Sequence, residues 1–252
     1  MTKLSVNVNK LATLRNSRGK NNPDVVQKSL EIVSLGGQGI TVHPRPDERH
    51  IRRADVYALK KALDPKVEFN IEGYPSDDFI KMVIEVKPAQ VTLVPDPPDA
   101  LTSNAGWMVR AAEQVLRKSA QQLSRAGIRT SVFVDPTTTH ETDYNLLKAL
   151  GVDRVELYTE RFAEAFGHST SDAVTADYKQ AATLAKRAGL GVNAGHDLTS
   201  ENLTKLIEAI PWIDEVSIGH ALICEALDLG LKETIRRYLA AIEAGARKAG
   251  RS

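Results

Sequence analysis

Eight short apolar runs, rich in β-branched residues, recur along the chain. Their apolar positions are mostly continuous, which is typical of parallel strands that are buried on both faces. Between these runs, apolar residues such as Phe79, Ile80 and Val83 repeat with helical periodicity and fall on one helical face. The alternation predicts successive βα units. The expected strands are residues 4–8, 39–43, 67–71, 90–94, 130–134, 154–158, 191–194 and 215–219.

Several expected helices carry recognisable end signals. An apolar stripe over residues 105–126 predicts a long helix that ends at Gly127, since glycine readily adopts the left-handed conformation that follows a helix. Ser171 or Asp172 is expected to cap the start of a later helix. Helical periodicity also continues over residues 231–248, beyond what one closing helix requires, which predicts an added helix or an oligomer contact.

The number of repeats and the chain length together favour one architecture. Eight βα units with short connections fit a (β/α)8 barrel, whereas a doubly wound sheet generally has fewer strands. The 252 residues exceed the ~150 of an average domain, yet single-domain barrels run to about 250. No linker-like or low-complexity tract divides the chain. We therefore predict an α/β protein, a (β/α)8 TIM barrel with extra helices, in one domain over residues 1–252.

Composition excludes several classes of function. Lys and Arg number 33 against 32 Asp and Glu, and the net charge of +1 lacks the basic excess of a nucleic-acid or membrane-surface protein. Cys224 is the only cysteine, which excludes an intrachain disulfide and a cysteine-type zinc site. The N-terminus has no apolar signal segment, and no long uncharged apolar run follows. We expect a cytoplasmic protein with no membrane span and no nucleic-acid partner.

Polar residues gather where the expected strands end, which is where barrel enzymes carry their catalytic groups. His43 ends the second run, and His196 and His220 follow the seventh and eighth, while Glu72 follows the third run and Glu156 lies in the sixth. Histidine titrates near pH ~6.5, and burial can raise the pKa of a glutamate towards neutrality. This set of side chains suits a reaction with several proton transfers.

The histidines could instead bind a divalent metal, as in metal-dependent barrel hydrolases. The surrounding charge argues against that alternative, because Arg45 and Arg49 place cations beside His43, and a cationic pocket suits phosphate better. We predict no metal site.

Two regions are candidates for binding phosphate. Residues 15–20 are basic and contain a glycine, although a solvated loop is the simpler interpretation. Gly195 and Gly219 lie in the loops after strands seven and eight, which form the recurrent phosphate site of barrels. Two separate regions indicate two phosphate groups. Lys10 is a candidate imine-forming lysine, or equally a partner for phosphate or carboxylate.

Five ordered blocks of sequence resemble the pyridoxine 5'-phosphate synthase family, and together they span nearly the whole chain. They are VNVNKLATLRNSRG at 6–19, GITVHPR at 39–45, NIE at 70–72, VNAGH at 192–196 and IGHA at 218–221. The resemblance implies a cytosolic (β/α)8 enzyme, assembled as a homo-octamer from dimers, with no metal or organic cofactor. The implied reaction condenses 1-deoxy-D-xylulose 5-phosphate with 3-amino-2-oxopropyl phosphate to pyridoxine 5'-phosphate, phosphate and water.

The resemblance also implies roles for individual residues. The catalytic residues would be His43, Glu72 and His196, with Glu156 stabilising a charged transition state. The aminoketone phosphate would be held by Asn7, Arg18, Gly219 and His220. The deoxyxylulose phosphate would face Asn9, Lys10, Arg45, His50 and Thr102, and the loop that contains Thr102 would close over the site. Asp197 would make a backbone contact with substrate.

Three positions depart from the family pattern. Asn9 and Lys10 stand where the family has Asp-His, so an amide and an ammonium replace a carboxylate and an imidazole. Asp197 replaces a common glycine, and its carboxylate would repel phosphate if it faced inward. Ser217 stands where asparagine is expected.

Two alternative functions stay open on the sequence. One is a metal-dependent barrel hydrolase. The other is a non-enzymatic module that binds a phosphosugar or RNA through the basic loops, although the net charge near zero and the lack of an exposed aromatic series argue against RNA.

Overall fold

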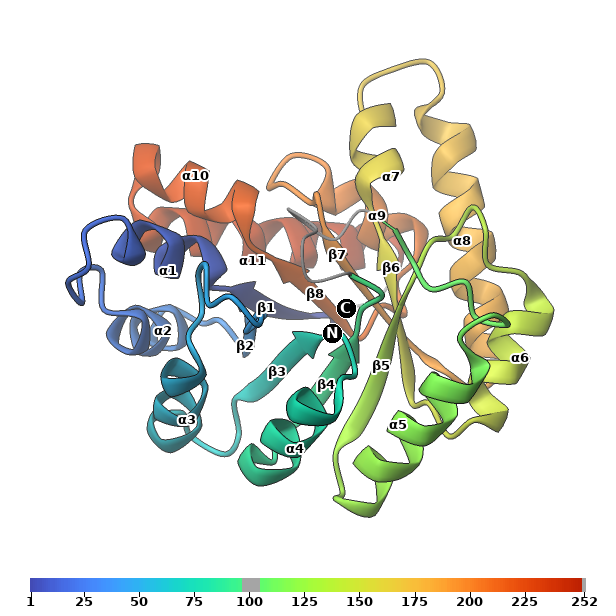
Figure 1. Ribbon diagram of the computed structural model, residues 1–252. Coiled ribbons are helices and arrows are strands. Elements are labelled where there is room, and N and C mark those ends of the chain that lie inside the picture. The colour runs from blue at the N-terminus through green and yellow to red at the C-terminus, as the bar shows by residue number, and fades with distance from the viewer. Residues whose placement is uncertain (97–104, 251–252) are drawn as a thin grey trace.

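The strands close into a parallel barrel in chain order. In the residues that the computed structural model describes, 1–96 and 105–250, there are eight strands, each paired with the next, and β8 pairs with β1 (Figure 1). Their bounds are β1 Lys3–Asn7, β2 Gly39–Val42, β3 Glu68–Gly73, β4 Gln90–Leu93, β5 Arg129–Val134, β6 Arg154–Tyr158, β7 Gly191–His196 and β8 Glu215–Ile218. The predicted (β/α)8 TIM barrel is confirmed. The division into a single domain over 1–252 stays a prediction.

Helices surround the ring of strands on its outer side (Figure 1). Over the described residues they are α1 Asn9–Asn16, α2 Val25–Ser34, α3 Arg53–Ala62, α4 Asp77–Val86, α5 Glu113–Arg125, α6 Glu141–Ala149, α7 Glu160–Ala165, α8 Ser171–Arg187, α9 Leu203–Ala209, α10 His220–Leu229 and α11 Leu231–Lys248. Two helices follow each of β1, β6 and β8, so the predicted extra helices are present. Within the described part of the chain, none of the helices has the length and apolar character needed to cross a membrane.

The expected helix over residues 105–126 begins later than its apolar stripe predicts. α5 starts at Glu113, because the preceding segment bonds instead to carbonyls of the neighbouring strands β4 and β5. The backbone N–H of Trp107 donates to Phe133 O at 3.0 Å, and its indole Nε1–H donates to Leu93 O at 2.9 Å. Gly106 permits this approach, since a Cβ there would overlap the backbone at Asp135.

The predicted cap of α8 is wrong. Thr170 is the N-cap residue, and its side chain makes no capping hydrogen bond. Ser171 and Asp172 face another helix instead: Lys205 Nζ donates to Ser171 Oγ at 2.9 Å and pairs with Asp172 Oδ1 at 2.5 Å. Both candidate capping side chains therefore bind Lys205 on α9 and do not cap α8.

The interior of the barrel is polar. Thr92 on β4 donates to Glu156 on β6, and Asn193 on β7 donates to Gln90 on β4, both at 3.4 Å. These strands are not neighbours, so the bonds cross the inside of the barrel. Further hydrogen bonds link the side chains of Ser5, Thr41, Asn70 and Thr92. The apolar core lies between strands and helices, and the polar interior positions the groups above it.

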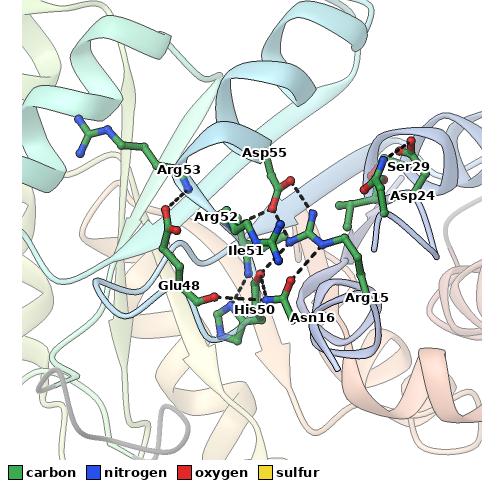
Figure 2. A network of polar contacts seen from close by, with 12 residues as sticks. Arg15, Asn16, Asp24, Ser29, Glu48, His50, Ile51, Arg52, Arg53 and Asp55 are labelled. Atoms are coloured by element: carbon green, nitrogen blue, oxygen red, sulfur yellow. Dashed lines mark hydrogen bonds and ion pairs between the residues drawn. The ribbon is translucent and has the colours of Figure 1, made fainter. Parts of the chain in front are cut away.

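Arg15 is a buried structural residue and not a loop cation. It lies in α1, its side chain is 2% exposed, and its Nη1 and Nη2 donate to both carboxylate oxygens of Asp55 at 2.6 and 2.9 Å. Nη2 also donates to the carbonyl of His50 at 3.1 Å, as Figure 2 shows. Asp55 in turn accepts the N–H of Arg52 at the start of α3. This network fixes α1 against the segment that carries His50.

Removal of the Asp55 carboxylate tests this network. Asp55→Ala leaves the Arg15 guanidinium buried without its counter-charge, so we expect the free energy of unfolding to fall by about 3–5 kcal/mol in urea titrations. Glu31→Ala, which removes the exposed Lys28–Glu31 pair, is the control and should change it by less than ~1 kcal/mol. Equal effects of the two variants would contradict the structural role of Arg15.

Candidate active site

A cavity of about 420 Å³ opens at the carboxyl ends of the strands. Its walls come from the ends of all eight strands, β1 to β8, and from the loops after them. The lining residues are Asn7, Asn9, Lys10, His43, Arg45, His50, Glu72, Val94, Phe133, Glu156, His196, Asp197, Ser217, Gly219 and His220. Among the described residues, every predicted site residue except Arg18 therefore lies at this one cavity.

Two predicted residues are not placed there. Arg18 is exposed just beyond α1 and is absent from the described lining of the cavity, so its role in binding phosphate stays a prediction. Thr102 lies outside the described residues, together with the loop that was expected to close over the site.

His43 and Glu72 form a pair of opposite acid–base character. His43 Nδ1 lies 3.9 Å from Glu72 Oε2, which also accepts the Asn7 amide at 3.3 Å. Burial, and then the charge of Glu156, raises the pKa of Glu72 well above its usual value. Burial, and then the charge of Arg45, lowers the pKa of His43 well below 6.5. Both shifts favour the neutral form, so the site pairs a carboxyl that holds its proton more strongly than usual with an imidazole that is less readily protonated than usual.

Glu156 is a buried carboxyl that titrates in the physiological range. Burial raises its pKa to about 7, while the hydrogen bond from Thr92 and the charge of His196 act in the opposite direction. A Cβ at position 195 would overlap Glu156 Oε1. Gly195 therefore leaves room for this carboxyl in its present position, a reason separate from the phosphate contact that the sequence suggested.

His196 ends β7 in an unusual backbone conformation, with φ at +94°. Its Nδ1 lies 2.6 Å from Asp197 Oδ2. The ring meets the edge of Tyr158 with centroids 5.2 Å apart and planes at 82°. The hydroxyl of Thr159 donates to Gly195 O at 2.7 Å and accepts from Asp197 N at 3.3 Å. The backbone of His196 is thus fixed by the bonds of Thr159 to the residues before and after it, and its ring is packed against Tyr158.

The cationic side of the cavity is partly neutralised. Arg45 Nη2 contacts Asp96 Oδ2 at 2.6 Å, and both side chains are buried. Burial, together with the charges of Arg45 and Lys10, lowers the pKa of His50 to about 4. His50 Nδ1 accepts the N–H of Ile51 at 2.9 Å, so its neutral ring carries the proton on Nε2. His50 is consequently a neutral hydrogen-bond donor.

Amide and glycine residues shape the wall formed by β1 and β8. Asn9 Oδ1 accepts the N–H of His43 at 3.0 Å, and Asn7 Oδ1 accepts the N–H of Asn9 at the same distance. An aspartate at position 9 would provide the same acceptor, so this departure from the family pattern preserves the contact. Gly219 precedes α10, and a Cβ there would lie 3.0 Å from the Asn7 side chain. The backbone therefore approaches closely at a helix N-terminus, a favourable place for phosphate.

Sequence reasoning missed two kinds of functional residue. Thr159 follows the sixth strand directly, so its place at a strand end was the signal that could have identified it. Val94 and Phe133 line the cavity but are apolar, and nothing in their chemistry distinguishes them from core residues. In residues 1–96 and 105–250, His, Cys, Asp and Glu side chains form no group of three or more that could hold a metal ion.

Fold and site together define a (β/α)8 barrel whose cavity, at the carboxyl ends of the strands, is lined by acidic and basic side chains, in the place where barrel enzymes carry their active sites. Residues 4–244 match the family model of pyridoxal phosphate biosynthesis protein PdxJ. The pyridoxine 5'-phosphate synthase of Porphyromonas gingivalis is 55% identical over 238 residues, covering 94% of this chain and 98% of the relative. That of Bacteroides thetaiotaomicron is 56% identical over 240 residues, with coverage of 94% and 98%. The chain belongs to the pyridoxine 5'-phosphate synthase family.

Solved structures support the fold at low sequence identity. The 3-hexulose-6-phosphate synthase of Salmonella typhimurium gives a TM-score of 0.67 at 14% identity, covering 97% of this chain and all (100%) of that one. A phosphoribosyl anthranilate isomerase gives a TM-score of 0.59 at 15% sequence identity. The match covers 96% of this chain and 99% of that one. The comparisons favour neither the metal-dependent hydrolase nor the non-enzymatic binding module.

The buried carboxyl of Glu156 predicts a pH-dependent stability. An unfolded glutamate loses its proton near pH 4.5, whereas folded Glu156 retains it to about pH 7, so its contribution to stability falls as pH rises through this window. The Glu156→Gln variant has no carboxyl to ionise at this position, so it does not lose stability in this way. Relative to wild type, its free energy of unfolding should rise by about 2.5 kcal/mol between pH 5 and pH 8.

Urea titrations across this pH range measure the difference. Glu31→Gln, which changes an exposed carboxyl, serves as the control and should follow the wild-type curve. Parallel curves for Glu156→Gln and wild type would show that Glu156 titrates like an ordinary glutamate.

Proposed function

We propose that this chain is a pyridoxine 5'-phosphate synthase, which condenses 1-deoxy-D-xylulose 5-phosphate with 3-amino-2-oxopropyl phosphate to pyridoxine 5'-phosphate, phosphate and water. The main support is the identity of 55% across 94% of the chain with a protein of that name. The cavity supports the same proposal, because it gathers Glu72, His43, Glu156 and His196 in one place. No metal or organic cofactor takes part in the proposed reaction.

His43 and Glu72 would carry the first proton transfers. Attack of the amine on the ketone produces an ammonium proton that must leave, and loss of water requires a proton on the departing oxygen. Neutral His43 accepts the first proton and protonated Glu72 donates the second. The Asn7 amide then stabilises the carboxylate that Glu72 becomes, through the hydrogen bond it already makes.

His196 and Glu156 would act on the later steps. His196 donates a proton to the leaving oxygen, and the Glu156 carboxylate stabilises positive charge that develops on the substrate nitrogen. Glu156 is buried in a low-dielectric site, where a fixed charge acts more strongly than in water. Its pKa of about 7 lets it change charge state within the cycle.

Two groups of residues would hold the two phosphates. Gly219 and His220 at the N-terminus of α10, with Asn7, face the aminoketone phosphate. The deoxyxylulose phosphate is assigned to a second group, Asn9, Lys10, Arg45, His50 and Thr102. Arg18 is assigned to phosphate binding on the family resemblance, and Asp197 to a backbone contact on the same ground.

The proposal extends to assembly and location. A cytoplasmic homo-octamer built from dimers is expected from the family resemblance. Leu14 on α1 and Leu227 on α10 support an oligomer, because they are 52% and 76% exposed on helices that pack together. Burial of these side chains against another subunit would remove apolar surface from water.

Turnover of the two substrates tests the proposed function. Protein treated with chelator is mixed with both phosphorylated substrates, and pyridoxine 5'-phosphate is followed by absorbance and mass. We expect product from wild type and a loss of about 10²–10⁴-fold in kcat for His196→Asn, because a general acid acts in the transition state. The KM values should stay within about twofold.

His168→Asn provides the control, since this exposed histidine lies between α7 and α8, away from the cavity, and should leave kcat unchanged. A folded protein that binds both phosphates and forms no product would overturn the proposed function. An unchanged kcat in His196→Asn would remove only His196 from the mechanism.

A further inference from the structure

The side chains of His196 and Asp197 lie on the same side of the chain although they are consecutive residues. Successive residues of a strand normally point to opposite faces. The positive φ of +94° at His196 breaks that alternation, and both side chains line the cavity. Their contact is a hydrogen bond of 2.6 Å between His196 Nδ1 and Asp197 Oδ2.

We propose that Asp197 is a positioning residue that fixes the orientation and tautomer of His196 for proton transfer. This inference rests on the proposed function, because it gives Asp197 a role through the histidine assigned there. Asp197 does not contact substrate with its carboxylate in this account. Its negative charge is directed at the imidazole, which limits the repulsion of phosphate expected from the sequence.

The backbone around His196 is held in a strained conformation. A non-glycine residue at such a φ costs on the order of 1–3 kcal/mol, so the surrounding structure must stabilise it. Thr159 does so: its fully buried hydroxyl donates to the carbonyl before His196 and accepts the N–H after it. Asn202 adds a bond from Nδ2 to Asp197 O at 3.5 Å. These contacts bring the Asp197 carboxylate to Nδ1.

The ring orientation follows from two contacts. A carboxylate accepts hydrogen bonds, so the neutral imidazole carries its proton on Nδ1 and its lone pair on Nε2. Tyr158 packs edge-on against the ring and restricts its rotation, while the Tyr158 hydroxyl is itself held by Glu160 at 2.7 Å. Proton exchange with substrate is thereby assigned to Nε2. The lone pair there takes a proton from substrate in an earlier step, the imidazolium keeps its counter-charge at Nδ1, and Nε2 then gives that proton to the leaving oxygen.

The same arrangement of a carboxylate behind a histidine orients the general base of serine proteases, where loss of the carboxylate costs about 10⁴-fold in kcat. Here the histidine and aspartate side chains are 27% and 34% exposed, so solvent screens the pair. A smaller effect of about 10–100-fold is expected. The family pattern commonly has glycine at this position, so the device belongs to this chain and is not a general feature of the pattern.

A first experiment reads the tautomer without any turnover. Protein labelled with ¹⁵N-histidine is examined by NMR in the unliganded state, and the His196 signals are assigned by their loss in His196→Asn. We expect wild type to show the Nδ1–H tautomer, and Asp197→Gly to show a mixture with more Nε2–H. Identical tautomer populations in the two proteins would overturn the proposal. This result does not depend on which reaction the protein catalyses.

A second experiment measures coupling between the two residues. Asp197→Asn should lower kcat by about 10–100-fold with KM within about twofold, and should have no further effect in the His196→Asn background. Glu201→Gln, an exposed acid in the same loop, is the matched control and should leave kcat unchanged. An equal loss in both backgrounds, or a rise in KM alone, would assign Asp197 a direct contact with substrate and overturn the positioning role.

Discussion

The cost of ionising a buried group is the constraint on which the site depends. Glu72, Glu156 and His43 lie where the polar interior of the barrel meets the cavity, and burial is the largest influence on the pKa of each. Desolvation favours the neutral form of acids and bases alike. The same environment therefore shifts the carboxyls towards the protonated form and the imidazole towards the unprotonated form. An acid and a base can therefore occupy one site in their neutral forms, because both are shielded from water.

Hydrogen bonds across the barrel make this burial possible without collapse of the site. The side chains of Thr92 and Asn70 connect strands below the cavity, and Thr92 donates to Glu156. Charged groups that are also buried are mostly paired, as Arg15 is with Asp55 and Arg45 is with Asp96. Paired charges lend rigidity to the walls, while Glu72, Glu156 and His43, whose pKa values are shifted by burial, are the groups proposed to carry the chemistry. The stability of the walls and the reactivity of the site therefore depend on different side chains.

The sequence predicts the barrel well because its signals are local. Each strand is a continuous apolar run, and His43 and His196 are recognisable by position at a run's end. The pairing of Arg15 with Asp55 joins residues far apart in the chain, and a basic loop and a buried ion pair look alike until that partner is known. Trp107 belongs to a helical stripe by periodicity, yet tertiary hydrogen bonds to strands override it. The contact between His196 and Asp197 depends on one backbone angle that no residue pattern specifies.

Infrared difference spectroscopy of unliganded wild type against Glu72→Gln near neutral pH tests the central claim most directly, since a protonated carboxyl and a carboxylate absorb at separate frequencies. Because burial and the neighbouring charge of Glu156 raise the pKa of Glu72, we predict that the substitution removes a carbonyl band of a protonated carboxylic acid. Loss of carboxylate bands alone would show that Glu72 is ionised in the resting protein, and would contradict an acid and a base held neutral side by side.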